Sequence, residues 1–201
     1  MKIDIINKSL VLLGEEPITS VNQKPFGRLM DMLYEDTKKS LLSMYPWRFA
    51  IKREFLPVLD EDTMYHKFKY KYELPSDCLL VLKQGEFYKT PDLRDFIADT
   101  GELYIIEGKS IYSNINPFML HYVSNVSEEL FTPLFEIALA TKIASLASVK
   151  IKQNTNLVQL YESEYQGYIS LAITNNEIIQ DTQSLSENSW VAVRRGWNNG
   201  D

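Results

Sequence analysis

The chain has 201 residues, of which 45% are hydrophobic and 24% are charged, so a packed core is expected rather than disorder. The formal net charge of −6 argues against a protein whose main task is to grip nucleic-acid phosphates, although an acidic wall would let DNA slide past. Cys78 is the single cysteine, which excludes an internal disulfide and favours a reducing compartment.

Two amphipathic helices are expected at the start of the chain. Apolar residues recur at helical spacing from Lys2 to Leu13, and Gly14 is expected to end this helix as its C′ residue. A second helix is expected from Pro25 to Tyr45, and Pro46 ends it because proline lacks an N–H and clashes with the preceding turn. Its predicted apolar face consists of Phe26, Leu29, Met30, Leu33, Thr37, Leu41 and Met44.

The stretch from Ser43 to Ile51 combines this helix stop with large aromatic side chains. Trp47 and Phe49 follow Pro46 where the chain changes direction and enters a β region. We therefore predict that Pro46, Trp47 and Phe49 are the structural anchors of a hinge.

Short strands are expected between Arg48 and Val123. Aromatic residues alternate with charged residues from Lys67 to Glu73, which indicates a half-buried strand whose wet face carries Lys67, Lys69 and Lys71. Glycine and proline punctuate the region and no long helix intervenes, so we expect an antiparallel meander. Further strands are expected at Cys78–Leu82, Glu86–Lys89, Leu103–Ile106 and Phe118–Val123.

Helix returns at about Glu128, with Ser127 and Thr132 as candidate N-caps. The stretch Phe135–Val149 is rich in alanine and serine, which allow another helix to approach closely. A cap at Asn154–Asn156 is expected to begin a last long helix that ends at about Ile179. Its predicted apolar side consists of Leu157, Leu160, Tyr161, Tyr168, Leu171 and Ile178.

This order of elements predicts an α+β fold. Residues 1–47 and 127–180 would form an antiparallel bundle of about four helices, and residues 48–126 would form an inserted small antiparallel β-sheet. Residues 181–201 would form an extended C-terminal arm.

Few residues suggest catalysis. His66 and His121 lie in β segments without a nearby second ligand, which is typical of surface or core histidines rather than metal ligands. Cys78 lies in an apolar strand and is expected to be a buried structural thiol. Acidic residues cluster at Glu15-Glu16, Asp60–Asp62 and Glu128-Glu129, but such clusters are usually solvated turns or helix starts. We therefore predict no catalytic, cofactor-binding or metal-binding residue.

The C-terminal arm is unusual because Trp190 and Trp197 flank Arg194 and Arg195. Tryptophan and arginine are enriched at binding hot spots, and the surrounding sequence offers no apolar helix or strand face of its own. Two interpretations stay open: the arm folds back onto its own helices, or it docks on another subunit or a partner.

Five segments, in order along nearly the whole chain, are similar to the motifs of one known family. Asn7–Ser20 is similar to an opening helix with an LGE-x-P-I turn, and Leu42–Ala50 is similar to an L-x-x-x-P-W-x-F-A segment. Tyr70–Cys78 resembles Y-x-Y-x-L-P-x-D-C, Leu130–Leu146 resembles a P-x-x-F-x-x-A-x-x-x-x-L-A helix, and Ser189–Arg195 resembles a closing S-W-x-x-x-R segment. Together they resemble the tail tubular protein A family, the head-to-tail adaptors of short-tailed phages. The loops between Gly85 and Gly108 match nothing in the family.

The resemblance implies a structural connector without enzymatic activity or cofactor. It implies a ring, commonly of twelve copies, which sits beneath the portal protein, hands the genome to the tail tube or nozzle protein, and lets double-stranded DNA pass without sequence-specific binding. The chain would be assembled in the host cytoplasm, would belong to the neck or tail of the virion, and would have no membrane partner. Trp190, Arg194, Arg195 and Trp197 would be the portal-binding residues of the arm.

Two alternatives remain open at the level of the sequence. The first is a cell-wall hydrolase of the tail, which would need two carboxylates from the acidic clusters facing each other across a cleft. The second is a host-side adaptor that binds another helical protein without forming a ring.

Overall fold

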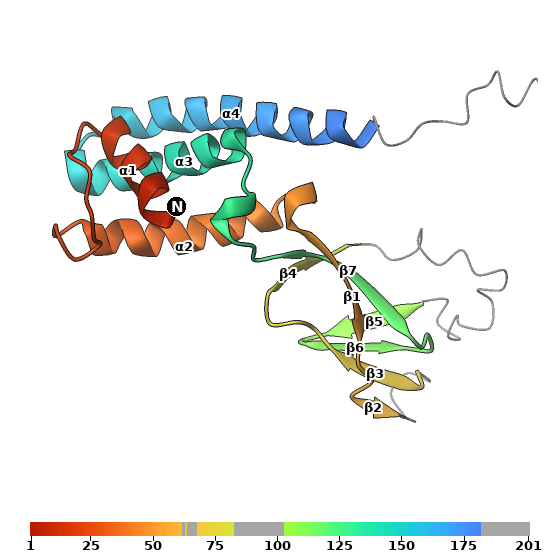
Figure 1. Cartoon of the computed structure of the whole chain (residues 1–201). Coiled ribbons are helices and arrows are strands. Elements are labelled where there is room, and N and C mark those ends of the chain that lie inside the picture. Colours follow the sequence, from red (N-terminus) through yellow and green to blue (C-terminus); the bar gives the residue numbers. More distant parts are fainter. Residues whose placement is uncertain (62, 64–67, 83–102, 182–201) are drawn as a thin grey trace, which may run out of the picture. The chain divides into compact units, whose positions relative to one another are not determined.

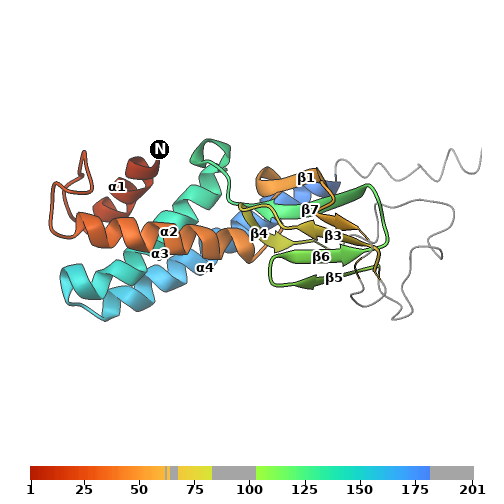
Figure 2. The same ribbon diagram turned by 90° about the horizontal axis from the view of Figure 1, so that it is seen from below.

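The computed structural model describes residues 1–61, 63, 68–82 and 103–181, which Figure 1 and Figure 2 show from two directions. The chain divides into two compact units. The first contains residues 1–4 and 18–131, and the second contains residues 5–17 and the part of the chain from residue 132 onwards. Each unit is therefore built from stretches that are far apart in the sequence.

The first unit combines one long helix with short antiparallel strands. Strands β1, β7 and β4 form a three-stranded sheet in that order, and β2, β3, β6 and β5 form a four-stranded sheet in that order. Helix α2 contacts β4 and β7. The elements are α2 (Gly27–Ser43), the 3-10 turn η1 (Arg48–Ala50), β1 (Ile51–Leu56), β2 (Asp60–Glu61), β3 (Tyr70–Glu73), β4 (Cys78–Val81), β5 (Tyr104–Glu107), β6 (Ser110–Ser113), β7 (Phe118–Ser124) and the 3-10 turn η3 (Glu128–Leu130).

Both sheets contribute to one apolar core. Strand β7 is the central strand of its sheet and is buried along most of its length, and three of its side chains belong to this core. The hydroxyl of Tyr72 donates to the carbonyl oxygen of Ile115 at 2.6 Å, so a phenol can be wholly buried without an unsatisfied polar atom. The core residues are Leu56, Tyr72, Ile111, Ile115, Phe118, Leu120 and Tyr122.

The second unit is helical. It contains α1 (Lys2–Leu12) from Ile5 onwards, α3 (Pro133–Lys152) and α4 (Asn156–Asp181). Helices α3 and α4 run antiparallel and side by side (Figure 1), and the Oγ of Ser145 on α3 donates to the carbonyl oxygen of Val158 on α4 at 3.3 Å. The small side chains of α3 thus allow the close helix approach that their pattern predicts.

Polar contacts attach α1 to this helix pair. The ammonium of Lys8 lies 2.5 Å from Oε2 of Glu136, and that of Lys152 lies 2.7 Å from Oε1 of Glu15. The hydroxyl of Tyr161 donates to the carbonyl oxygen of Leu12. Gly14 has a φ of +68°, so the predicted left-handed stop of the first helix is confirmed.

The predicted α+β fold is confirmed, because along the chain two helices precede and two helices follow a region of short antiparallel strands. The insertion holds two small sheets rather than one, and β1, β2 and β6 had not been predicted. Strand β1 lies at a sheet edge and is mostly exposed, which hides the alternation that marks a half-buried strand. Strand β6 follows β5 after the two-residue turn Gly108-Lys109, in which Gly108 has a φ of +58°.

Two parts of the sequence prediction fall outside this description. The expected strand at Glu86–Lys89 and residues 182–201 of the expected arm lie outside the described residues. In the division into compact units, α2 belongs with the strands. The domain boundaries expected at residues 47 and 127 stay a prediction.

The apolar faces predicted for α2 and α4 were partly wrong. On α2, Met44 is exposed, whereas Tyr34 and Lys38 are buried. On α4, three residues of the predicted core side are exposed and the buried side lies roughly 140° around the helix. The exposed residues are Leu160, Leu171 and Ile178, and the buried ones are Tyr161, Tyr165, Ile169, Ala172 and Asn176. A helix with apolar residues on two faces does not reveal from its periodicity which face meets the core.

Candidate functional site

Trp47 anchors the turn between α2 and β1. Its side chain is 1% exposed, and its indole Nε1 donates to the carbonyl oxygen of Leu41 at 2.8 Å. Leu41 lies in the last turn of α2, where helix carbonyls lack an intrahelical partner. The indole stacks on Phe49 with ring centroids 5.9 Å apart, and Phe49 in turn contacts Phe131. Pro46 precedes this aromatic cluster and is exposed, so the helix stop and the anchor are adjacent but separate features.

A partly buried ion pair joins α2 to η3. The ammonium of Lys38 lies 2.9 Å from Oε1 of Glu128, and the hydroxyl of Tyr34 donates to the same oxygen at 2.8 Å. Burial favours the neutral acid, but the Lys38 ammonium and the Tyr34 hydroxyl outweigh it and hold the pKa of Glu128 below its usual value. Glu128 is therefore a structural carboxylate and not a solvated member of an acidic cluster.

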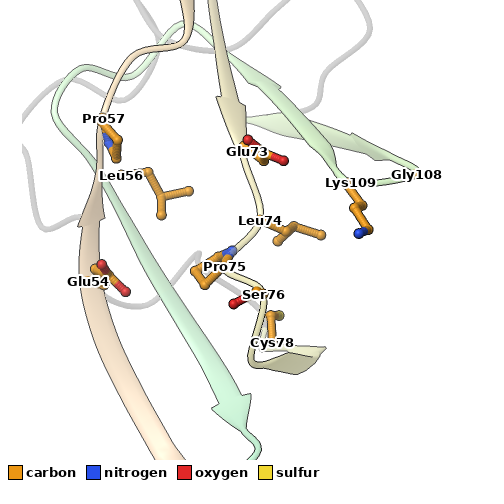
Figure 3. Close-up of a pocket in the computed structure, with 10 residues that line it drawn as sticks. All are labelled: Glu54, Leu56, Pro57, Glu73, Leu74, Pro75, Ser76, Cys78, Gly108 and Lys109. Atoms are coloured by element: carbon orange, nitrogen blue, oxygen red, sulfur yellow. The ribbon is translucent and has the colours of Figure 1, made fainter.

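The first unit has an open pocket of about 600 Å³ between β1, the β3–β4 turn and the β5–β6 turn (Figure 3). Its apolar lining comes from Leu56, Pro57, Leu74, Pro75 and Cys78, and exposed charged residues, Glu54, Glu73 and Lys109, also line it. An apolar surface with a few charged groups can hold a small ligand or an amphipathic side chain.

The carboxylates of this pocket do not come from the predicted acidic clusters. Glu54 and Glu73 lie on different strands, and in the view of Figure 3 the side chains of Leu56 and Pro75 lie between them. The residues that line this pocket include none from Glu15-Glu16, Asp60–Asp62 or Glu128-Glu129. The pocket thus offers no support for a hydrolase built from those clusters.

Tyr122 connects Glu54, which lines the pocket, to a polar cluster. Its hydroxyl lies 3.2 Å from Oε2 of Glu54 and 3.1 Å from Oδ1 of Asp77, and the ammonium of Lys52 lies 2.5 Å from Oδ2 of Asp77. Burial and the two carboxylates raise the pKa of Tyr122, so it stays a hydrogen-bond donor at neutral pH. Burial opposes ionisation of Asp77, but Lys52 and Tyr122 outweigh it and lower the pKa of that carboxyl. These contacts hold the turn before β4 against β1 and β7, which is a structural task.

The described histidine and the cysteine occupy structural positions. His121 is 2% exposed on β7, and burial followed by the charge of Arg53 on the paired strand lowers its pKa. Cys78 is partly exposed and lines the pocket, which corrects its expected full burial; desolvation and Asp77 raise the pKa of the thiol, so it is not an activated nucleophile. His66 and Lys67 lie outside the described residues. No group of three or more histidine, cysteine, aspartate and glutamate side chains in the described part of the chain could hold a metal ion.

A row of exposed residues runs along α4. Leu160, Leu171 and Ile178 are 51%, 57% and 58% exposed, and Gly167 lies on the same line. We call the residues of this line the α4 stripe: Leu160, Glu164, Gly167, Leu171, Thr174 and Ile178. At 100° per residue they fall within a sector of about 80°, so they form one face. A Cβ added to Gly167 would meet no atom within 4 Å, which shows that this part of the face is open.

The predicted portal-binding residues, Trp190, Arg194, Arg195 and Trp197, lie outside the described residues. No helix of the described chain is long and apolar enough to cross a bilayer. No family model matches the chain, and no curated protein matches it.

Proposed function

We propose that this chain is a structural head-to-tail connector of a short-tailed phage. It would assemble as a ring, commonly of twelve copies, that joins the portal to the tail tube or nozzle and forms part of the DNA channel. The observation that carries this proposal is the ordered resemblance of five segments to the tail tubular protein A family.

The positions of the four described segments support the proposal, because each coincides with a structural junction. Asn7–Ser20 contains the end of α1 with its Gly14 stop, and Leu42–Ala50 forms the turn anchored by Trp47. Tyr70–Cys78 contains β3 and the turn into β4, and Leu130–Leu146 contains the start of α3 with its Thr132 cap. Motifs placed at junctions determine the path of the chain, as expected of a protein whose function is to hold a shape.

The charge of the chain suits a channel component. The net charge of −6 disfavours tight contact with phosphates. Several lysines of the described region are engaged in ion pairs with carboxylates, namely Lys2, Lys8, Lys38, Lys52, Lys142 and Lys152. A wall of this kind would repel a passing duplex rather than retain it.

The experiment that tests the proposal combines the purified chain with the portal protein of the same phage. We expect mass photometry and electron microscopy to detect a ring of this chain stacked on the portal ring. A variant with Trp190, Arg194, Arg195 and Trp197 all changed to alanine should lose portal binding. The matched control changes the exposed residues Phe55 and Leu59 to alanine and should bind normally. Absence of any complex with the portal, at protein concentrations that saturate other connectors, contradicts the proposal.

A further inference from the structure

The residues of the α4 stripe are all exposed. Leu160, Leu171 and Ile178 each leave more than half of their surface in water, on the face opposite the buried tyrosines. Scattered exposed leucines are common, but a line of them along one helix marks an interaction surface. Gly167 lies in the interior of this helix, where glycine is less stable than alanine by up to about 1 kcal/mol. Its position on the stripe leaves a flat place on which a large ring can lie.

We propose that, in the free chain, the segment of residues 182–201 from the same molecule covers the α4 stripe. The proposal concerns the uncomplexed protein and does not depend on the connector function. It selects between the two interpretations that the sequence leaves open for the arm, and it assigns the docking surface that the arm uses before any partner is present.

The position and length of this segment favour it as the occupant. It begins directly after Asp181, at the end of the helix that carries the stripe, and in Figure 1 that end of α4 extends past the start of α3. The distance along α4 from Asp181 back to Leu160 is about 32 Å. Residues 182–201 reach about 66 Å when extended, so a short reversal leaves enough chain to follow the whole stripe.

The chemistry of the segment complements that of the stripe. Trp190 and Trp197 would supply the apolar surface that covers the exposed leucine and isoleucine side chains, and the flat surface at Gly167 would accept an indole. The charged residues of α4 are all acidic: Glu162, Glu164, Glu177 and Asp181. The only cations of residues 182–201 are Arg194 and Arg195, which lie between the two tryptophans. Glu164 lies on the stripe and has no ion-pair partner among the described residues, so it would accept one of these guanidinium groups.

A second copy of the chain fits the stripe less well. Pairing of two α4 faces would bring together helices whose charged residues are all carboxylates, and like charges disfavour such contact. The tethered segment also has an effective concentration of the order of millimolar, which a second copy reaches only in concentrated solution.

The test measures acrylamide quenching of tryptophan fluorescence in the full-length chain without any partner. Trp47 is buried, so the quenchable signal reports Trp190 and Trp197. Because a tethered segment is mostly bound, we expect a quenching constant at least about twofold below that of N-acetyltryptophanamide, unchanged on dilution. Leu171→Ser should raise the constant towards the value of the free indole. The matched control Leu146→Ser changes a leucine of similar exposure on α3 and should leave the constant as it is.

Charge exchange provides the second variant set. Reversal of both arginines, Arg194→Glu with Arg195→Glu, should release the segment, and addition of Glu164→Lys should restore part of the protection. Protection that grows with protein concentration assigns the stripe to a second copy and overturns the proposal. Quenching equal to that of the free indole in the unmodified chain also overturns it. An equal response of Leu146→Ser and Leu171→Ser would show that the effect is not specific to the stripe.

Discussion

The ammonium of Lys38 lies 2.9 Å from the Oε1 carboxylate oxygen of Glu128, although the whole β region separates the two residues in the sequence. The pair links the second half of α2 to the turn that follows β7, and the ring of Phe131 lies 5.6 Å from the same ammonium. This one contact thereby joins the segments that precede and follow the β insertion. The pair is partly buried, so it is less screened than a surface ion pair.

Lys38→Met tests the energetic role of this contact. The substitution leaves the Glu128 carboxylate partly buried with the hydroxyl of Tyr34 as its side-chain donor, and we expect a loss of about 2 kcal/mol in the free energy of unfolding. Urea unfolding followed by circular dichroism measures the loss. Lys39→Met is the matched control, because Lys39 is exposed, and it should change stability by less than about 0.5 kcal/mol. Equal effects of the two variants contradict the assigned role of Lys38.

The same contact predicts how stability depends on acid. The pKa of Glu128 is lower in the folded chain than in the unfolded chain, where it is about 4.3. The carboxylate therefore contributes stability that is fully present above that value and is lost as pH falls through the folded pKa. We expect the stability difference between the unmodified chain and Glu128→Gln to be constant near neutral pH and to shrink below about pH 4. A difference that grows on acidification contradicts the sign of the pKa shift.

Trp47→Phe tests the aromatic anchor. The variant keeps a ring in the cluster but removes the N–H that satisfies the carbonyl of Leu41, and we expect a loss of about 1–3 kcal/mol. Phe55→Leu is the control, since Phe55 is 58% exposed and its change should be nearly neutral. Thermal and urea unfolding of both variants provide the measurement. A neutral Trp47→Phe would show that the indole N–H does not stabilise the end of α2.

Thr132→Ala and Ser127→Ala separate the two candidate caps. The Oγ1 of Thr132 accepts from the backbone N–H of Phe135 at the start of α3, whereas Ser127 makes no side-chain cap bond at η3. We expect a loss of about 1 kcal/mol for Thr132→Ala and almost none for Ser127→Ala. Urea unfolding decides between the two, and a larger effect at Ser127 reverses the assignment.

The positions of helix ends and turns could be predicted because local residues determine them. Gly14, Pro46, Thr132 and the cap at Asn154 act on backbone groups within a few residues, through a left-handed φ, a missing N–H or a short side chain that accepts a bond. The turn at Gly108 is also determined by local residues. It could therefore have predicted the hairpin and its second strand β6, although that strand had not been predicted.

Only the tertiary structure decided which side chains are buried and which residues they contact. Lys38 follows the polar pattern of α2 yet is buried, because Glu128, which is remote in the sequence, supplies a counter-charge. The pairing of Asp77 with Lys52 and Tyr122 likewise depends on strand register. On α4 the periodicity identified apolar residues on two faces but did not show which face is buried. Packing against α3 buries the face that carries the tyrosines. Long-range packing therefore left the α4 stripe exposed, whereas the amino-acid order alone determined where that helix begins.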